Sequence, residues 1–187
     1  MMKRDECLRI LARHVTDEIV VPVYSGAAEW LALNDRALDF YCVGAMGLAS
    51  SHALGLALAR PDKRVVVLDG DGSLLMNIGT LVTIAEAAPR NLTHLVIQNG
   101  TYEANGGHPI PNRDAVDLVG LARSAGITDG RAFSELADFE AGAAGLLTRD
   151  GPIFAALQVV PGKPPVFDYR AFYSAERRRA FAEALKT

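Results

Sequence analysis

The sequence has only two cysteines, Cys7 and Cys42, among its 187 residues. With so few, each is more simply explained as a small buried hydrophobic side chain than as half of a disulfide or redox pair. An excess of charge of one sign is also missing, because 19 Lys and Arg stand against 22 Asp and Glu, a net charge of −3. No extended basic block occurs, and the short tract Arg177-Arg178-Arg179 is better explained as a solvated face or a subunit contact, so nucleic acid and membrane surfaces are not expected as partners.

Long apolar runs are absent as well. No stretch approaches the length of a transmembrane helix, and the first residues include Asp5 and Glu6 where a signal peptide needs a continuous apolar core. We therefore expect a cytoplasmic protein. The length suits a single domain, residues 1–187, large enough to bury its own hydrophobic core.

Short apolar runs alternate with amphipathic stretches along the whole chain. This alternation predicts an α/β fold, with three α/β/α layers around a mainly parallel sheet. The expected strands are 19–24, 38–43, 65–68, 92–97, 131–133 and 152–159. The expected helices are 3–15, 26–33, 49–59, 74–88, 115–126, 135–149 and 174–186, with Ser25, Ser73, Asp114 and Ser134 as N-caps and a break at 161–165.

The rest of the chain is organised around residues 64–99. Residues 65–68 are apolar without alternation, which is typical of an interior strand of a parallel sheet. Gly70 and Gly72 then allow a tight turn and a close approach of the backbone to a ligand, and Ser73 leads into a helix. The amino end of a helix attracts anions, so this turn has the properties of a diphosphate site.

A diphosphate in a protein normally comes with Mg²⁺, which takes oxygen ligands and needs only one or two carboxylates. Asp71 supplies one carboxylate directly after the first strand. Asn99 follows the next strand, which should lie beside the first, and its amide oxygen is the natural second ligand. The carbonyl of Thr101 is a candidate third.

The string GDGS, followed later by QNGTY, resembles the signature of thiamine diphosphate-dependent enzymes. The run 44–92 is similar to the diphosphate-binding part of sulfopyruvate and phosphonopyruvate decarboxylases. This resemblance implies thiamine diphosphate and Mg²⁺ as cofactors, with Asp71, Asn99 and Thr101 as metal ligands. Gln98 stands where many members have another Asn, a departure that leaves the metal ligand intact.

The loop after the expected strand 38–43 holds Met46 between Gly44 and Gly47. The resemblance implies that Met46 lies under the cofactor and enforces its bent shape, and that the carbonyl of Gly44 accepts from its 4′-amino group. The alternative is that Met46 only fills a gap in the core. Together, the residues expected to contact the cofactor are Gly44, Ala45, Met46, Gly70, Asp71, Gly72, Ser73, Asn99, Thr101 and Tyr102.

The segment 100–111 is polar, rich in Gly and Pro, and too long for a plain connection. Loops at this edge of a sheet often contact substrate. Glu103 and His108 therefore join Met46 as candidate catalytic residues. The alternative for both is a solvated loop side chain.

The family mechanism needs a second carboxylate, a Glu on a separate pyrimidine-binding domain, and all 187 residues are used by the first domain. The resemblance thus implies a hetero-oligomer in which a pyrimidine-binding α subunit supplies the activating Glu. The expected substrate is a small 2-oxo acid with an anionic group, such as 3-sulfopyruvate or 3-phosphonopyruvate, and the expected reaction is loss of CO₂.

Other functions remain open at this point. The chain could be the cofactor-binding subunit of an acetolactate-type ligase, or a subunit that serves assembly without decarboxylating. VVVLDGDGS also fits the opening motif of haloacid-dehalogenase-like phosphatases, with Asp69 as nucleophile and Asp71 as acid. Against the phosphatase, the only lysines after Asp71 are Lys163 and Lys186, and no adjacent pair of acids follows.

Overall fold

The structure is a computed structural model that describes residues 1–163 and 166–187. Its centre is a five-stranded sheet in the order β1-β2-β3-β7-β6, and each neighbouring pair is parallel. The predicted parallel α/β fold is therefore confirmed. The strands are β1 Ile19–Pro22, β2 Val65–Gly70, β3 Leu92–Gln98, β6 Asp129–Phe133 and β7 Ile153–Gln158.

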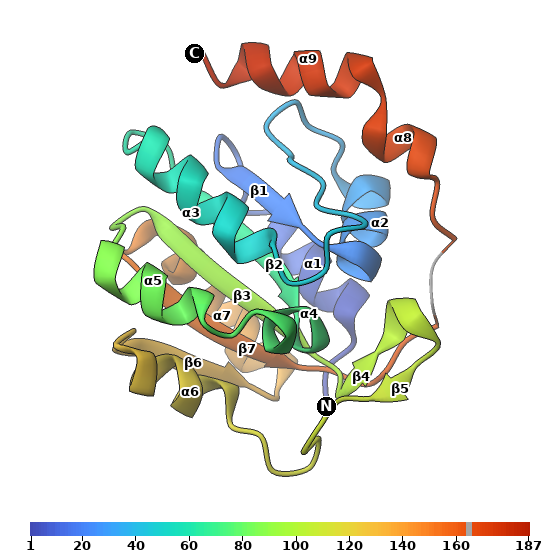
Figure 1. The fold of residues 1–187 in the computed structure, drawn as a ribbon, viewed down its shortest axis with the longest axis vertical. Helices are drawn as coiled ribbons and strands as arrows, with labels where there is room; N and C mark the ends of the chain where they lie inside the picture. The colour runs from blue at the N-terminus through green and yellow to red at the C-terminus, as the bar shows by residue number, and fades with distance from the viewer. Residues whose placement is uncertain (164–165) are drawn as a thin grey trace.

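Helices cover both faces of the sheet and complete the three layers (Figure 1). One face is covered by α1 Arg4–Ala12, α2 Tyr24–Leu33 and α7 Leu136–Thr148. The other is covered by α3 Ala49–Ala59, α4 Asp71–Met76, α5 Thr80–Ala87 and α6 Leu118–Ala125. A small hairpin of β4 Thr101–Tyr102 and β5 His108–Pro109 encloses the 3-10 turn η1 Glu103–Asn105, and α8 Tyr169–Tyr173 and α9 Ala175–Ala184 follow the sheet.

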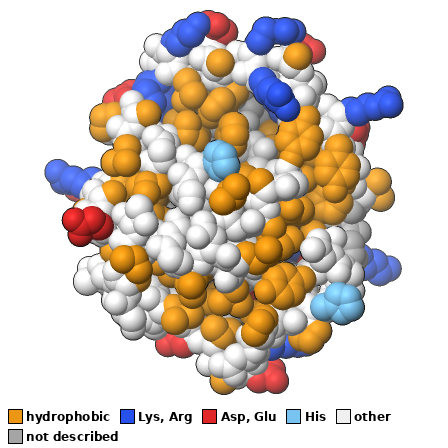
Figure 2. Space-filling view, viewed as in Figure 1, with side chains coloured by type: hydrophobic (Ala, Val, Ile, Leu, Met, Phe, Trp, Pro, Cys, Tyr) orange, Lys and Arg blue, Asp and Glu red, His pale blue; other side chains and the backbone are white. Residues whose placement is uncertain are grey.

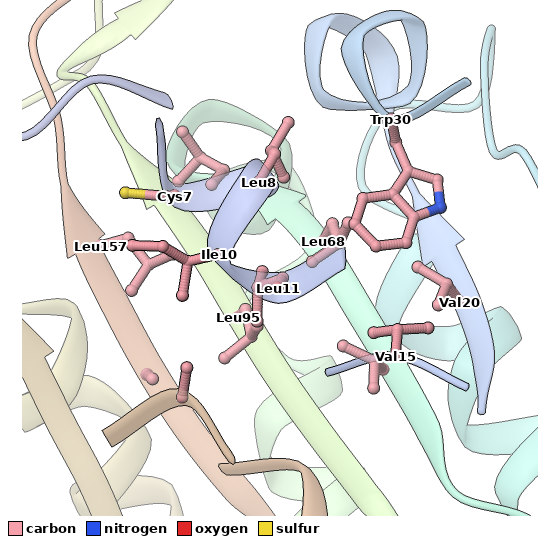
Figure 3. Close-up of a cluster of buried hydrophobic side chains, with 14 of the residues drawn as sticks. Cys7, Leu8, Ile10, Leu11, Val15, Val20, Trp30, Leu68, Leu95 and Leu157 are labelled. Atoms are coloured by element: carbon pink, nitrogen blue, oxygen red, sulfur yellow. The ribbon is translucent and has the colours of Figure 1, made fainter. Parts of the chain in front are cut away.

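The unbroken apolar run of β2 is explained by burial on both faces. Val65 and Val67 pack into the cluster under α3, whereas Val66 and Leu68 pack into the cluster under α1. Figure 3 shows the second cluster, in which side chains of α1 such as Leu8 lie against the sheet strands. Both faces therefore hold β2 in place, and its carboxyl end is a rigid base for the turn that follows.

Both cysteines are buried and free, as predicted. Burial raises the pKa of Cys7 to about 12 and that of Cys42 to about 11, so both are neutral thiols at physiological pH. Within residues 1–163 and 166–187, no helix is both long enough and apolar enough to cross a bilayer.

The predicted strand 38–43 is wrong. This segment runs beside β1 but makes only two isolated parallel bridges, Asp39 to Val20 and Cys42 to Val23. Asp39 turns its carboxylate into the molecule, where it accepts from the indole Nε1 of buried Trp30 at 3.0 Å. The segment thus covers the β1 edge of the sheet without forming a regular strand, and it leads directly into the loop that carries Met46.

The buried carboxyl group of Asp39 should make the stability of the fold depend on pH. Burial raises its pKa to about 6, although Arg36 and Trp30 act in the opposite direction. Because the folded-state pKa lies above the unfolded value of about 3.9, the contribution of Asp39 to stability is complete below that value and is lost as pH rises through 6. We expect the free energy of unfolding of the wild type, relative to Asp39→Asn, to fall by about 2 to 3 kcal/mol between pH 4 and 7. Urea unfolding of both proteins across this range is the test, and parallel pH profiles would contradict it.

The predicted helix 74–88 is two helices, α4 and α5, separated at residues 77–79. Asn77 ends α4 with φ −145° and ψ 50°, and its Nδ2 donates to the carbonyl of Gly47 at 3.0 Å. The helix is therefore interrupted at the point where it contacts the loop 44–47, called the Met46 loop below. The interrupting contact joins segments that are distant in the sequence.

The N-cap predictions for Ser25, Ser73, Asp114 and Ser134 are wrong. Helices α2, α4 and α7 begin after Val23, Gly70 and Glu135 without a side-chain cap, and α6 is capped by Asp117, whose carboxylate accepts from Gly120 N at 2.8 Å. Ser25 and Ser73 point instead toward the site described below. Of the break expected at 161–165, Pro164 and Pro165 lie outside the described residues, and α8 is an element that the sequence pattern did not predict.

Candidate functional site

The carboxyl ends of β1, β2 and β3 meet at one edge of the sheet, because the three strands are parallel neighbours. A pocket of about 450 Å³, part of it open to solvent, lies at this edge. Its walls come from the starts of α2 and α4, the Met46 loop, the β4 hairpin and the start of α1. The lining residues are Arg4, Val23, Tyr24, Ser25, Gly26, Met46, Asp69, Gly70, Asp71, Gly72, Ser73, Ile97, Asn99, Thr101, Tyr102, Glu103 and Ala104.

Asp71 lies at the tip of β2 with 1% of its surface exposed. Its Oδ1 accepts from Gly72 N at 2.8 Å, and its Oδ2 accepts from Gly100 N at 2.6 Å. The second bond joins the tips of β2 and β3. Burial raises the pKa of Asp71 to about 6 even though these backbone N–H groups stabilise the carboxylate, so the negative charge is costly unless a cation accompanies it.

Asn99 lies at the tip of β3 and is also buried. Its Oδ1 accepts from Thr101 N at 2.8 Å and from Thr101 Oγ1 at 3.1 Å, and its Nδ2 donates to Glu103 Oε2 at 2.7 Å. The structure therefore brings together Asp71, Asn99 and Thr101, the three residues expected to hold a metal.

These donors fit Mg²⁺ better than a transition metal. Among residues 1–163 and 166–187, no three His, Cys, Asp or Glu side chains form a group able to hold a metal ion by themselves. One carboxylate, one amide oxygen and a backbone carbonyl form a hard oxygen set that Mg²⁺ can share with phosphate oxygens.

A second anion-binding feature comes from α2, which begins at Tyr24 directly after β1. Ser25 is buried, lines the pocket, and its Oγ has no hydrogen-bond partner within the described part of the chain. A hydroxyl in the first turn of a ten-residue helix suits a phosphate oxygen. Sequence reasoning assigned Ser25 to an N-cap and missed this position. The available signal was that residues 24–26, like 70–73, form a strand-to-helix turn.

The ring of Tyr102 packs closely against the turn that follows β2. A Cβ on Gly72 would lie 2.5 Å from Cδ1 of Tyr102, so only glycine fits beneath that ring. Ser73 Oγ accepts from Gly47 N at 3.1 Å, which ties α4 to the Met46 loop. Gly70, Gly72, Ser73 and Tyr102, which are among the residues expected to contact the cofactor, thus form one wall of the pocket.

Only part of the loop 44–47 lines the pocket. Met46 lines it, whereas Gly44 and Ala45 do not. Gly44 adopts φ +84°, and a Cβ there would lie 3.1 Å from the hydroxyl of Tyr173, so α8 packs against this loop.

The two candidate catalytic residues of the segment 100–111, Glu103 and His108, lie in different surroundings. His108 is exposed on β5 and is not among the lining residues. Glu103 is buried, and its Oε2 accepts from Arg4 Nη1 at 2.8 Å as well as from Asn99. Arg4 also donates to Glu29 Oε1 at 2.6 Å. Burial alone would lower the pKa of Arg4, but the two carboxylates outweigh it and the pKa is raised, so this guanidinium stays charged.

Asp69 does not suit the phosphatase alternative. It is 1% exposed, its Oδ2 lies 3.1 Å from His94 Nε2, and its Oδ1 accepts from Gly70 N at 2.9 Å. Both oxygens are held by neighbouring groups of the turn and of β3, which suits a structural acid better than a nucleophile.

Comparison with known proteins decides the family. The model of the thiamine pyrophosphate enzyme C-terminal TPP-binding domain matches residues 25–156, which includes both strand tips and the Met46 loop. The chain belongs to this family. Thiamine pyrophosphate is another name for thiamine diphosphate, so the predicted cofactor class is confirmed.

Within this family, the chain is similar to two named relatives. It is 39% identical over 180 residues to sulfopyruvate decarboxylase subunit beta of Methanothermobacter thermautotrophicus, covering 95% of this chain and 94% of that one. It is 44% identical over 134 residues to phosphonopyruvate decarboxylase of Streptomyces hygroscopicus, covering 72% of this chain but only 33% of that protein. The chain thus belongs to the sulfopyruvate and phosphonopyruvate decarboxylase family of thiamine diphosphate-binding proteins, and it spans about a third of the Streptomyces protein.

A solved structure shares the fold. Benzoylformate decarboxylase of Polynucleobacter necessarius superposes with a TM-score of 0.69 at 18% identity, over 86% of this chain and 33% of that one. This likeness shows that the chain has the fold of the corresponding part of that protein. The match to the family model over residues 25–156 sets aside the phosphatase alternative.

Proposed function

We propose that this chain is the diphosphate- and Mg²⁺-binding subunit of a decarboxylase for 2-oxo acids that carry a second anionic group, such as 3-sulfopyruvate or 3-phosphonopyruvate. The observation that carries the proposal is the meeting of Asp71 and Asn99 at adjacent strand tips, joined by the hydrogen bond from Gly100 N to Asp71. The names of the two curated relatives support the choice of substrate class.

Each part of the pocket has a role in this proposal. Asp71, Asn99 and the carbonyl of Thr101 hold Mg²⁺ against the diphosphate. The hydroxyl of Ser25 and the first-turn N–H groups of α2 bind the phosphate oxygens. Met46 supports the ring system from the pocket wall. When bound, thiamine diphosphate supplies the electron sink for loss of CO₂ from a 2-oxo acid.

We infer that the activating Glu comes from another chain. Among the described residues that line the pocket, Glu103 is the only Glu; its Oε2 accepts from Arg4 and Asn99, which fixes the side chain against α1 and β3, while its Oε1 has no partner. We therefore place the active site at an interface with a pyrimidine-binding α subunit, consistent with the name of the Methanothermobacter relative as a subunit beta.

The surface beside the pocket suits such an interface. Leu48 and Met76 are 43% and 59% exposed, and they flank Gly47 at the end of the Met46 loop. Figure 2 shows hydrophobic side chains in several patches across this view, with the Lys and Arg side chains mainly toward its outline. Exposed apolar side chains next to a site are typical of subunit contacts.

The test is activity with and without the partner. We expect the isolated chain to show less than about 1% of the decarboxylase activity of the chain co-purified with the product of its neighbouring gene, because the activating carboxylate is missing. Product analysis with sulfopyruvate, phosphonopyruvate and pyruvate separates the candidates: an aldehyde identifies a decarboxylase, and a coupled hydroxy-oxo acid identifies an acetolactate-type ligase. Full activity of the isolated chain would refute the shared site.

A further inference from the structure

We propose that Glu103 is a positioning residue: anchored by Arg4, it fixes the side-chain amide of Asn99 so that Oδ1 faces the metal. The inference rests on the proposed function, because it assumes that Asn99 binds Mg²⁺. It assigns a role in the site to α1, an element outside the family motif and outside residues 25–156.

The hydrogen bonds of Asn99 permit only one orientation of its amide. Nδ2 donates to Glu103 Oε2 at 2.7 Å, while Oδ1 accepts from Thr101 N at 2.8 Å. A flipped amide would place its oxygen against a carboxylate and its nitrogen against an N–H donor. Both contacts would be repulsive, so Glu103 and Thr101 together exclude the flipped form.

Glu103 is itself held rigidly. Arg4 Nη1 donates to its Oε2 at 2.8 Å, and the side chains of Arg4 and Glu103 are 7% and 5% exposed. Glu29 holds the other arm of the guanidinium through Nη2 at 2.6 Å. A Cβ on Gly162 would lie 3.2 Å from Arg4 Nη2 and 3.7 Å from Glu103 Oε1, so the chain after β7 passes close to the pair.

The charge arrangement has a direct effect on the metal site. A carboxylate that accepts from an amide N–H polarises the amide and makes its oxygen a better metal ligand. Arg4 lies 2.8 Å from Glu103 and supplies the opposite charge, so the buried carboxylate is paired.

The experiment compares Glu103→Gln with Glu29→Gln in the chain co-purified with its partner subunit. Both variants remove a carboxylate bound to Arg4, but only Glu103 touches Asn99. The Mg²⁺ concentration for half-maximal thiamine diphosphate binding is measured by calorimetry. We expect Glu103→Gln to raise it by about 10- to 100-fold, because Arg4 keeps the Gln oxygen facing Asn99 and a neutral oxygen holds and polarises the Asn99 amide less strongly than a carboxylate does. We expect Glu29→Gln to change it less than about threefold.

A second readout follows the amide itself without metal or cofactor. The side-chain amide signals of Asn99 are assigned by NMR from their absence in Asn99→Asp. We expect the proton that faces Glu103 to be shifted downfield in the wild type and in Glu29→Gln, and to return toward ordinary asparagine values in Glu103→Gln. A purely structural role for Glu103 would not move this signal selectively.

The possible outcomes distinguish a failure of the positioning role of Glu103 from a failure of the proposed function. If Glu103→Gln and Glu29→Gln change the Mg²⁺ requirement equally, or if the Asn99 signal does not respond to Glu103→Gln, the positioning role is refuted while the proposed function stands. If the wild type binds no thiamine diphosphate, or if Asn99→Ala leaves Mg²⁺-dependent binding intact, the proposed function fails and the positioning role fails with it.

Discussion

Asp71→Asn is expected to weaken Mg²⁺-dependent thiamine diphosphate binding by more than about 100-fold, a larger loss than the 10- to 100-fold typical of residues behind the metal ligands. The substitution preserves shape but removes the only carboxylate among the three proposed ligands. In the wild type, cofactor at a hundred times its dissociation constant should add about 2.7 kcal/mol to the free energy of unfolding. Thermal unfolding with and without Mg²⁺ and thiamine diphosphate measures this gain, which the variant should lack.

Asp69→Asn is the matched control for this prediction. Asp69 lies two residues earlier, is equally buried, and accepts one backbone N–H, but its other oxygen contacts His94 instead of the tip of β3. We expect this variant to lose stability yet to bind the cofactor within about tenfold of the wild type. Equal losses in the two variants would mean that the metal site does not depend specifically on Asp71.

Arg4→Met is expected to lower the free energy of unfolding by about 3 to 5 kcal/mol, because it leaves the buried carboxylate of Glu103 without a counter-charge. This is a large part of the roughly 5 to 15 kcal/mol that holds a typical domain folded. Trp30 is the single tryptophan and is fully buried, so its fluorescence during urea unfolding reports the transition.

Arg13→Met provides the comparison, since Arg13 also lies near the first helix and pairs with Glu140 at 2.6 Å. That pair is exposed, with 59% and 52% of its side chains accessible, and should contribute less than about 1 kcal/mol. Adding Glu103→Gln to Arg4→Met should recover part of the loss, because the unpaired charge is then gone. Equal effects of Arg4→Met and Arg13→Met would contradict the account of the buried pair.

The placement of Asp71 and Asn99 could be predicted because it depends on local patterns alone. Two buried apolar runs predict neighbouring parallel strands, and parallel strands end at the same edge. Helix α3 was likewise predicted with its observed bounds, since nothing distant interrupts it. The break at Asn77 could not be predicted, because the group that Asn77 contacts is the carbonyl of Gly47, 30 positions away in the sequence.

The part of the site made by α1 was missed for a similar reason. Arg4 and Glu103 are 99 positions apart, and no motif links them. One signal was nevertheless present: Arg4 precedes Cys7, Leu8 and Leu11 by three, four and seven positions, which places a charge on the apolar face of the helix. A charge on that face must be paired when it is buried, so Arg4 predicts a buried acid without revealing which one.

The outer strands of the sheet also affect how separate molecules behave at high concentration. A bare strand edge can recruit another chain and begin aggregation. Here the β1 edge is covered by the segment around Asp39, and β6 is short and carries Asp129 and Arg131. Neither side of the sheet therefore offers a long, flat template on which a second molecule could extend it.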